Sequence, residues 1–349
     1  MFHELTVTEI SHETPDAVAI CLAVPGDLAG AFAYQPGQYL TLRAEVDGAD
    51  IRRSYSIAST GAGALTVGVK RVEGGAFSTY CQGLAKGATI KVMPPEGRFV
   101  THGEDSVLLV AAGSGVTPMV AIAADMLAKG AAVTLVYGNR NTGTIMFRNA
   151  LDSLKDKYLG LFTLIHVLSR ETQDVALLNG HVTGEKITRL AQAGAIDLEA
   201  TQGVYICGPG DMIDDVSKTL LAGGYPSEAI HFERFYQDGE AQRAPRSAAA
   251  EAAAQAGATV EVVLDGMRRQ FAMSAEDDTV IEAAERQGLE LPYSCRGGMC
   301  CTCRCKVTEG SAEMATNYSL EPWELEAGFT LACQTRPTSE KLVLDFDAA

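Results

Sequence analysis

Hydrophobic and polar residues alternate in short runs along the first third of the chain. Apolar residues occupy every second position in segments such as Glu4–Glu9, Tyr39–Arg43 and Leu65–Lys70, and turn-forming Gly and Pro residues separate these segments. A period of two is typical of strands that bury one face. Many short strands with such turns favour a closed antiparallel β-barrel. We therefore expect residues 1–103 to form a β-barrel.

The pattern changes from Asp105 onward, where short apolar runs alternate with segments of helical period. Such alternation predicts buried strands joined by helices, and thus a doubly wound, parallel α/β sheet over residues 104–237. The helices include Pro118–Leu127 and Asp211–Leu221. The expected strands are Val107–Val110, Ala132–Tyr137, Leu161–Val167, Gly203–Cys207 and Ala229–Phe232.

The last part of the chain begins with residues 238–258, which are mostly Ala, Gln and Gly and have no apolar period. We expect a linker there, helical in part, that lets the following domain move. Residues 259–349 then predict a hairpin at Thr259–Met273, a helix at Thr279–Gln287 and a closing strand at Lys341–Leu344. Gly288 gives the helix a C-terminal signal. This order predicts a mixed α+β domain.

Composition is that of an ordinary globular protein. The 349 residues are 47% hydrophobic and 21% charged, which is enough for two or three domains. The net charge is −16, and from Thr259 onward we count 16 acidic and 8 basic residues. This sign argues against nucleic acid binding and favours either a basic protein partner or simple solubility. The N-terminus lacks a signal-peptide pattern, so we expect a cytoplasmic protein without a membrane segment.

Four cysteines have the spacing of an iron–sulfur site. Cys295, Cys300 and Cys303 form C-x4-C-x2-C, and Cys333 follows after 29 residues. This is the spacing of plant-type [2Fe–2S] ligands. Zinc or disulfides are the alternatives, but zinc sites commonly use two C-x2-C pairs or added histidines. Six of the nine cysteines lie between Cys295 and Cys333, which favours metal ligation in a reducing compartment.

The remaining cysteines are expected not to bind metal. Cys301 lies inside the ligand loop and Cys305 lies two residues past Cys303, but the ligand spacing is complete without either. Free cysteine often behaves as a small apolar residue. Cys21 and Cys81 are interpreted as packing residues for the same reason.

The uncharged run Ser106–Ala124 contains a glycine turn. Its length could suit a membrane span, but Gly113, Gly115 and Pro118 in its middle predict a strand, a tight turn and a helix. Backbone N–H groups at such a turn can hold a pyrophosphate. The turn departs from the G-x-G-x-x-G pattern, because Pro118 replaces the last glycine, and it lacks the lysine of a P-loop. By itself this glycine turn is only moderate evidence for a nucleotide-binding site.

Two short motifs in the first third could bind a flavin nucleotide. In Arg53-Ser54-Tyr55-Ser56 the arginine suits a pyrophosphate, the tyrosine a planar ring and Ser56 a flavin nitrogen. The turn Gly75-Ala76-Phe77-Ser78 offers N–H groups and a hydroxyl to phosphate oxygens. Alone, each is weak, because Tyr and Arg on a strand are commonly an ordinary cross-strand pair.

In order and spacing, these motifs resemble those of the ferredoxin–NADP reductase superfamily, as do Pro36–Tyr39 and Pro95–Phe99. The resemblance implies FAD, with Tyr55 stacked on the isoalloxazine, and a nicotinamide nucleotide at G-x-G-x-T-P. It also places Ser56, Cys207 and Glu233 at the site of hydride transfer, with Phe235 over the flavin face. The implied nucleotide-binding residues are Gly113, Gly115, Thr117, Pro118, Arg140, Ser169, Arg170, Cys207, Gly208 and Pro209.

Ser169 and Arg170 bear on the choice of nucleotide. An arginine beside a hydroxyl can clamp the 2′-phosphate of NADPH, although a solvated charged turn is an equally good reading of the residues alone. A Ser-Arg pair at this place is similar to the one that selects NADP in the superfamily. We therefore expect NADPH to be preferred over NADH.

Residues 259–349 resemble the β-grasp fold of plant-type ferredoxins, and the whole domain order resembles the reductase components of multicomponent oxygenases. NADPH delivers two electrons as a hydride, a [2Fe–2S] cluster takes one at a time, and a flavin does both. The implied partner is a di-iron oxygenase component. Alternatives are the reductase of another oxygenase or of a hybrid-cluster protein, and, in a different class, a redox-sensing iron–sulfur protein.

Overall fold

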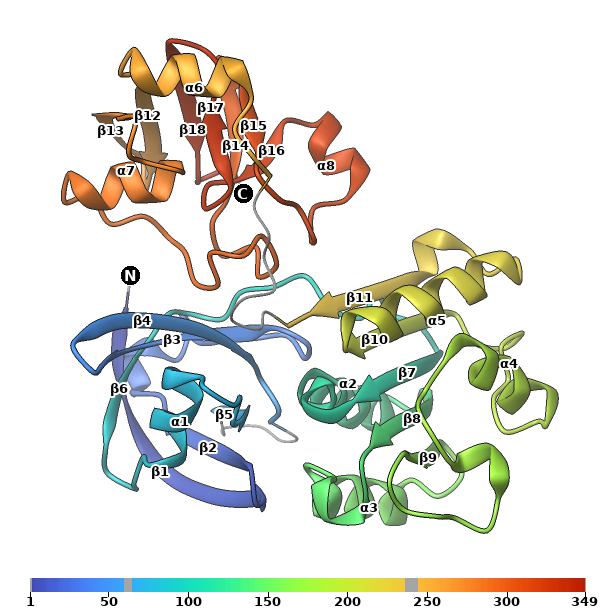
Figure 1. Cartoon of the computed structure of the whole chain (residues 1–349). Coiled ribbons are helices and arrows are strands. Elements are labelled where there is room, and N and C mark those ends of the chain that lie inside the picture. The colour runs from blue at the N-terminus through green and yellow to red at the C-terminus, as the bar shows by residue number, and fades with distance from the viewer. Residues whose placement is uncertain (1, 60–64, 236–243, 349) are drawn as a thin grey trace. The chain divides into compact units, whose positions relative to one another are not determined.

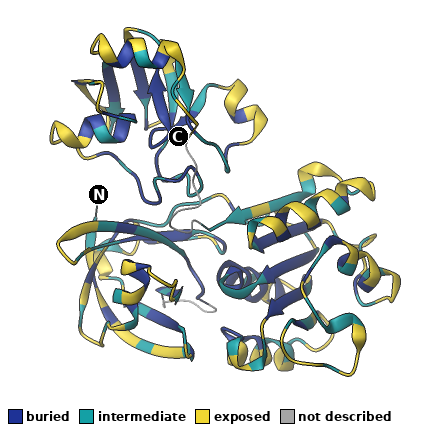
Figure 2. Ribbon diagram, in the orientation of Figure 1, coloured by how far each residue is buried: buried dark blue, intermediate teal, exposed yellow. Residues whose placement is uncertain are grey.

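A computed structural model of the chain describes residues 2–59, 65–235 and 244–348. The chain divides into two units, residues 1–235 and 236–349, which are drawn together in Figure 1 and described here one at a time. Figure 2 shows that the inner strands of the parallel sheet are mostly buried and that most helices expose part of their surface. Among the helices of the described residues, none is long and apolar enough to cross a membrane.

The first unit begins with the predicted antiparallel β-barrel. Its six strands are hydrogen-bonded in the order β4-β3-β6-β1-β2-β5, and a bridge between Ile57 and Val67 joins the two ends of this order. Leu5 and Val7 point into the core while Thr6 and Thr8 are exposed, as the period of two requires. The elements are β1 (His3–Thr14), β2 (Ala17–Ala23), β3 (Tyr39–Val46), β4 (Ala49–Ser56), β5 (Leu65–Lys70), α1 (Ala76–Gln82) and β6 (Thr89–Val92).

The predicted doubly wound sheet follows in the same unit. Its five parallel strands have the order β11-β10-β7-β8-β9. In β7, Leu109 packs toward α2 and Leu108 toward α5, so both faces of the strand are covered. The run Ser106–Ala124 is therefore strand, turn and helix, as predicted. The elements are β7 (Ser106–Ala112), α2 (Val116–Ala128), β8 (Ala132–Asn139), α3 (Arg148–Lys157), β9 (Phe162–Leu168), α4 (Gly184–Gln192), β10 (Gly203–Gly208), α5 (Gly210–Ala222) and β11 (Ile230–Arg234).

The barrel and the parallel sheet share one hydrophobic core. Ala17, Ala19 and Phe99 of the barrel pack with residues of α2 and β7. At Gly68 the approach is so close that an added Cβ would lie 2.6 Å from the Thr117 side chain and 2.8 Å from Phe147. The barrel and the sheet are thus in contact close to the glycine turn at Gly113 and Gly115.

The second unit contains the predicted β-grasp fold. Its main sheet has the order β13-β12-β18-β14-β16, with β12 and β18 parallel and the hairpin β12–β13 at one edge. Helix α7 buries Val280, Ile281 and Ala284 against this sheet. The elements are β12 (Thr259–Leu264), β13 (Met267–Ala272), α7 (Val280–Arg286), β14 (Arg304–Glu309), β15 (Ala312–Met314), α8 (Pro322–Glu326), β16 (Phe329–Leu331), β17 (Thr335–Pro337) and β18 (Lys341–Asp345).

The Ala-rich segment differs from a simple linker. Of the interval predicted as a linker, residues 238–243 lie outside the described residues, but the rest is part of the second unit. Helix α6 (Ala248–Gln255) begins at Ser247, whose hydroxyl accepts a hydrogen bond from the Ala250 N–H, and buries Ala250, Ala253 and Ala254. Small side chains at this spacing let the helix lie close to the unit even though they show no strong apolar period.

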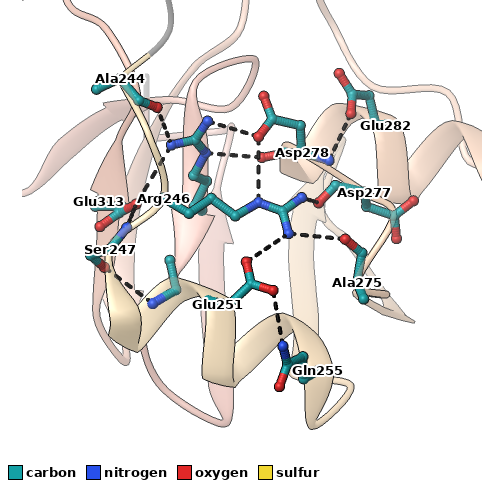
Figure 3. A network of polar contacts seen from close by, with 12 residues as sticks. Ala244, Arg246, Ser247, Glu251, Gln255, Ala275, Asp277, Asp278, Glu282 and Glu313 are labelled. Carbon is teal, nitrogen blue, oxygen red and sulfur yellow. Dashed lines mark hydrogen bonds and ion pairs between the residues drawn. The ribbon is translucent and has the colours of Figure 1, made fainter.

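Arg246 fastens α6 to the second unit (Figure 3). Its guanidinium donates to the carbonyl oxygens of Ala275 at 2.9 Å and Asp277 at 2.6 Å, and it pairs with Asp278 at 3.4 Å. Arg336 binds the same Asp278 carboxylate at 2.7 Å and the Ala244 carbonyl at 2.8 Å. Two arginines thus share one aspartate at the base of the Ala-rich segment.

Replacing Arg246 by Ala is expected to destabilise the second unit by about 2 kcal/mol, because several hydrogen bonds to charged and carbonyl groups are lost together. The measurement is thermal unfolding of the full chain, followed by the visible circular dichroism of the cluster. Arg269→Ala, at an exposed position on β13, is the control and should change the midpoint little. Equal shifts in the two variants would contradict this account of Arg246.

Candidate functional site

Strand β4 presents the first flavin motif at the rim of the barrel. Arg53, Ser54 and Tyr55 are half-buried and Ser56 is buried. The Tyr55 ring lies nearly parallel to the Phe77 ring of α1, with centroids 6.1 Å apart. One side of Tyr55 is therefore supported by Phe77 while the residue stays partly open, which suits a ring that stacks on a planar ligand.

The turn before α1 uses its serine internally. The Ser78 hydroxyl donates to the Gly75 carbonyl at 3.1 Å and accepts from the Val72 N–H at 3.0 Å. Gly74 has φ +74°, a conformation that favours glycine. Ser78 therefore shapes the turn, and the N–H groups at the start of α1 are the donors best placed to meet a phosphate.

Ser56, Cys207 and Glu233 meet inside the first unit. The Ser56 hydroxyl donates to the Glu233 carboxylate at 3.1 Å across 177 residues of sequence. Cys207 on β10 is paired in register with Glu233 on β11. Cys207 is fully buried, and this burial, followed by the nearby Glu233 charge, raises the pKa of its thiol well above the usual value. The buried side chain therefore belongs to the core beside Glu233.

The predicted glycine turn is tight and lies against the end of β10. Gly113 has φ +56°, and an added Cβ on Gly115 would lie 2.1 Å from the Cys207 carbonyl oxygen. The Thr117 hydroxyl donates to the Ser114 carbonyl at 2.9 Å, and Pro118 lies in the first turn of α2, where no N–H partner is lost. Gly208 and Pro209 lead from β10 into α5 beside this turn.

Positive side chains lie where β8 and β9 end. The Arg170 N–H donates to the Arg140 carbonyl at 2.7 Å, and the Ser169 N–H donates to the Asn139 carbonyl at 2.9 Å. The neighbouring Glu171 carboxylate is held by the Thr142 N–H and hydroxyl. Arg140, Ser169 and Arg170, predicted from separate motifs, are therefore adjacent at one edge of the sheet.

Two residues of this edge were missed from the sequence. Asp16 on the β1–β2 turn pairs with Arg140 at 3.0 Å and with Lys70 at 3.8 Å. Lys70 lies close to the glycine turn, since a Cβ added to Gly113 would be 3.9 Å from its Nζ atom. Burial lowers the pKa of Lys70. Only the packing of the barrel on the sheet brings these residues together, so no local pattern could indicate them.

Phe235 is the last described residue of the first unit. It is half-buried and packs against the core shared by the barrel and the sheet. This places it one residue beyond β11 and two residues from Glu233.

The four predicted cluster thiols come together in two pairs. Cys295 is hydrogen-bonded to Cys300 and Cys303 to Cys333. These thiol contacts lower the pKa of Cys295 and Cys333, the acceptors, and raise that of Cys300 and Cys303. No group of three or more His, Cys, Asp or Glu among the described residues is arranged to hold a single metal ion.

N–H groups surround the sulfurs as an anionic cluster requires. The Gly297 and Cys300 N–H groups donate to the Cys295 sulfur at 3.3 and 3.4 Å. The Gln334 amide donates to the Cys333 sulfur at 3.4 Å and to the Arg296 carbonyl at 2.7 Å. Gln334 was missed from the sequence because a residue next to a ligand has no pattern of its own. These donors stabilise thiolate and cluster charge when the cluster is bound.

The other cysteines have different surroundings. Cys301 has φ +59°, and its thiol donates to the Ser319 hydroxyl at 3.0 Å. Cys305 is buried in β14, where burial raises the pKa of its thiol. Cys81 is buried in the barrel core, and Cys21 lies 3.2 Å from the Thr66 hydroxyl. In each case the side chain has a packing or hydrogen-bonding role within the fold of its own unit.

Family comparisons match all three folds. Residues 4–101 match the oxidoreductase FAD-binding domain, residues 109–218 the oxidoreductase NAD-binding domain, and residues 262–338 the 2Fe-2S iron-sulfur cluster binding domain. These matches confirm the predicted flavin, nicotinamide nucleotide and [2Fe–2S] cofactors.

Relatives extend over the whole chain. One component of the 1,2-phenylacetyl-CoA epoxidase from Escherichia coli (strain K12) is 44% identical over 99% of this chain and 98% of that protein. The ferredoxin reductase component of 3-ketosteroid-9-alpha-monooxygenase from Rhodococcus rhodochrous is 37% identical over 98% of this chain and 96% of that protein. The structure of phthalate dioxygenase reductase matches with a TM-score of 0.59 at 23% identity, covering 99% of this chain and 98% of that one. The last likeness supports the three-domain fold.

Replacing Cys333 by Ser is expected to abolish the [2Fe–2S] signal, because one of the two thiol pairs is broken. NADPH-dependent dye reduction by the flavin should persist, since the first unit is unchanged. Iron content and the electron paramagnetic resonance of the reduced protein measure the first effect, and a dye assay the second. Cys301→Ala is the control: it leaves all four paired thiols in place and should keep the signal. Loss of the cluster in Cys301→Ala would show that Cys301 is a ligand.

Proposed function

We propose that this chain delivers electrons from NADPH to a di-iron oxygenase component. The chain belongs to the ferredoxin–NADP reductase superfamily, among the members with a C-terminal [2Fe–2S] domain. The chain is an NAD(P)H-dependent oxidoreductase. The proposed acceptor is the oxygenase of a phenylacetyl-CoA 1,2-epoxidase that acts in phenylacetate catabolism. The observation that carries this choice is the 44% identity over nearly the full length of both chains. The segments Glu313–Gly328 and His231–Phe235 carry the same likeness.

In this proposal the first unit holds FAD and NADPH. FAD, when bound, supplies the conversion of a hydride into single electrons. Tyr55 stacks on its ring, and Arg53, Ser54 and the Gly75 turn hold its phosphates. Ser56 and Glu233 orient polar groups at the reacting edge, while the buried Cys207 keeps water away from it. Phe235 would cover the flavin face on the side of the nicotinamide.

The preference for NADPH over NADH would come from the positively charged residues at the ends of β8 and β9. The turn residues Gly113, Gly115, Thr117 and Pro118 bind the pyrophosphate, and Gly208 and Pro209 border the nicotinamide. Ser169, Arg170 and Arg140 would hold the 2′-phosphate, which only NADPH carries. The Glu171 carboxylate is hydrogen-bonded to the Thr142 N–H and hydroxyl, so it already has partners other than Arg170.

In this proposal electrons leave the protein through the cluster site of the second unit. Cys295 with Cys300, and Cys303 with Cys333, would hold the two irons, and the N–H groups of Gly297 and Gln334 would stabilise their sulfurs. A cluster of this type has a potential of roughly −400 mV. Such a potential is low enough to reduce a di-iron oxygenase centre.

Reconstitution tests this function. The purified chain is mixed with the oxygenase subunits of a phenylacetyl-CoA epoxidase, NADPH, oxygen and phenylacetyl-CoA. We expect NADPH oxidation coupled to epoxide formation, together with flavin bleaching and a reduced [2Fe–2S] signal before oxygen is added. The oxygenase component of a 3-ketosteroid monooxygenase serves as the competing acceptor. Faster turnover with that acceptor would reject the proposed partner, and a chain that NADPH cannot reduce would favour a redox sensor.

Arg170→Ala is expected to raise KM for NADPH tenfold or more and to leave KM for NADH unchanged. The reason is the loss of a charge-assisted contact to the 2′-phosphate, which is worth about 1.5–3 kcal/mol. Steady-state kinetics with both nucleotides measure it. Arg189→Ala, an exposed arginine on α4, is the matched control. Equal efficiency with the two nucleotides in the unmodified protein, or an unaltered KM in Arg170→Ala, would reject NADPH selection by this residue.

Ser56→Ala is expected to slow flavin reduction by NADPH about tenfold or more, since a hydrogen bond at the reacting edge, worth about 1.4 kcal/mol or more, is lost. Stopped-flow absorbance of the flavin gives the rate, and its dependence on NADPH concentration gives the Kd. We expect the Kd and the FAD content to stay the same, and Ser56→Thr to recover part of the rate. A weaker Kd with an unchanged limiting rate would assign Ser56 to nucleotide binding instead.

A further inference from the structure

Helix α8 carries two large apolar side chains on the surface of the second unit. Trp323, the only tryptophan of the chain, is 54% exposed and Leu325 is 43% exposed. Among the described residues of this unit, Met267 at the tip of the β12–β13 hairpin is the remaining exposed large apolar residue. Figure 2 shows α8 as an exposed helix, and Figure 1 places it beside β16, apart from α6 and α7.

The segment leading into α8 touches the cluster loop directly. The Tyr318 N–H and the Ser319 hydroxyl both donate to the Gly298 carbonyl at 3.1 Å. The Cys301 thiol donates to Ser319 at 3.0 Å. Trp323 is thus four residues from a side chain that contacts the loop between the cluster ligands. A protein that binds α8 would lie against this loop.

A buried ion pair fixes α8 in place. Glu324 is completely buried and its carboxylate accepts from Arg304 at 2.7 Å, one residue past the ligand Cys303. The same carboxylate caps the helix by accepting from the Glu321 N–H at 3.0 Å. The Arg304 guanidinium also lies 3.6 Å from the Phe329 ring centroid. Burying an ion pair costs desolvation energy, and here the pair ties the five-residue helix to β14 while Trp323 and Leu325 stay exposed.

The surroundings of these two residues are acidic. Glu321 and Glu326 are exposed on either side, and Glu321 accepts a hydrogen bond from the Trp323 indole at 2.7 Å. From Thr259 onward 16 acidic residues outnumber 8 basic ones. A rigid aromatic anchor with a charged rim is typical of the energetic centre of a protein interface. The complementary surface is an apolar pocket bordered by Lys and Arg.

We propose that Trp323 and Leu325, which flank the buried Glu324 on the two sides of α8, are the docking anchors for the oxygenase component, and that this component offers a basic-rimmed apolar surface that spans the helix. The inference rests on the proposed function, because it needs an external electron acceptor. The flavin unit of the same chain is a less suitable occupant. It is covalently tethered, so its effective concentration is high, and it can reach the cluster without a strong anchor.

The test compares electron flow into and out of the cluster in the full-length holoprotein. Trp323→Ala and Leu325→Ala should reduce the cluster with NADPH at the unmodified rate, as followed by stopped-flow absorbance and electron paramagnetic resonance. In the reconstituted epoxidase assay, each should raise the apparent KM for the reductase tenfold or more, with full turnover regained at high concentration. Met267→Ala, equally exposed on the same unit, should leave both measurements unchanged. Cluster content confirms folding of every variant.

Charge is tested separately with Glu326→Lys. It should raise the same KM and weaken the dependence of turnover on salt, because one attractive charge becomes repulsive. If the Trp323 and Leu325 variants keep unmodified turnover and an unaltered KM, the docking inference is overturned but the proposed function is not. Slower reduction of the cluster by NADPH would assign α8 to the flavin unit instead. Failure of the unmodified chain to support the epoxidase would overturn the proposed function and, with it, this docking partner.

Discussion

The second unit brings four thiols together from two segments that lie far apart in the sequence. Three come from one loop, and the fourth comes from a segment that β14 and β16 bring alongside. The ladder pairs Arg304 with Leu331, and the Ala332 N–H donates to the Cys303 carbonyl at 2.9 Å. The loop that carries three of these thiols has positive φ angles at Arg296, Gly298 and Cys301. Such conformations are costly for side chains other than glycine and persist only where the surrounding structure holds them.

The first unit solves a related problem by sharing a core. Flavin and nicotinamide must meet at one place, yet their motifs belong to different folds. Close approaches at Gly68 and Gly115 bring the barrel against the parallel sheet and the glycine turn against β10. The hydrogen bond from Ser56 to Glu233 then closes the site. An added methyl group at either glycine would disturb the site through packing alone.

Two ion-pair networks of the second unit hold segments at its surface in place. Arg246 ties the Ala-rich segment to Asp278, so part of the apparent linker belongs to the domain that it precedes. Arg304 and Glu324 hold α8 beside the cluster loop. Both networks use ion pairs to fix position, one for the chain that enters the unit and the other for a surface that faces outward.

The sequence by itself determined the fold of each domain and the chemistry of its cofactors. Local periods of two and 3.6 specify strands and helices, and the spacing C-x4-C-x2-C specifies a ligand loop, because these signals depend on neighbours in the chain. Only the tertiary structure decided the meeting of Asp16 with Lys70 and Arg140, the approach of Gln334 to a cluster sulfur, and the packing of α6. Contacts between distant residues and weak helical signals in Ala-rich segments are settled by the packing of whole elements, which no local pattern records.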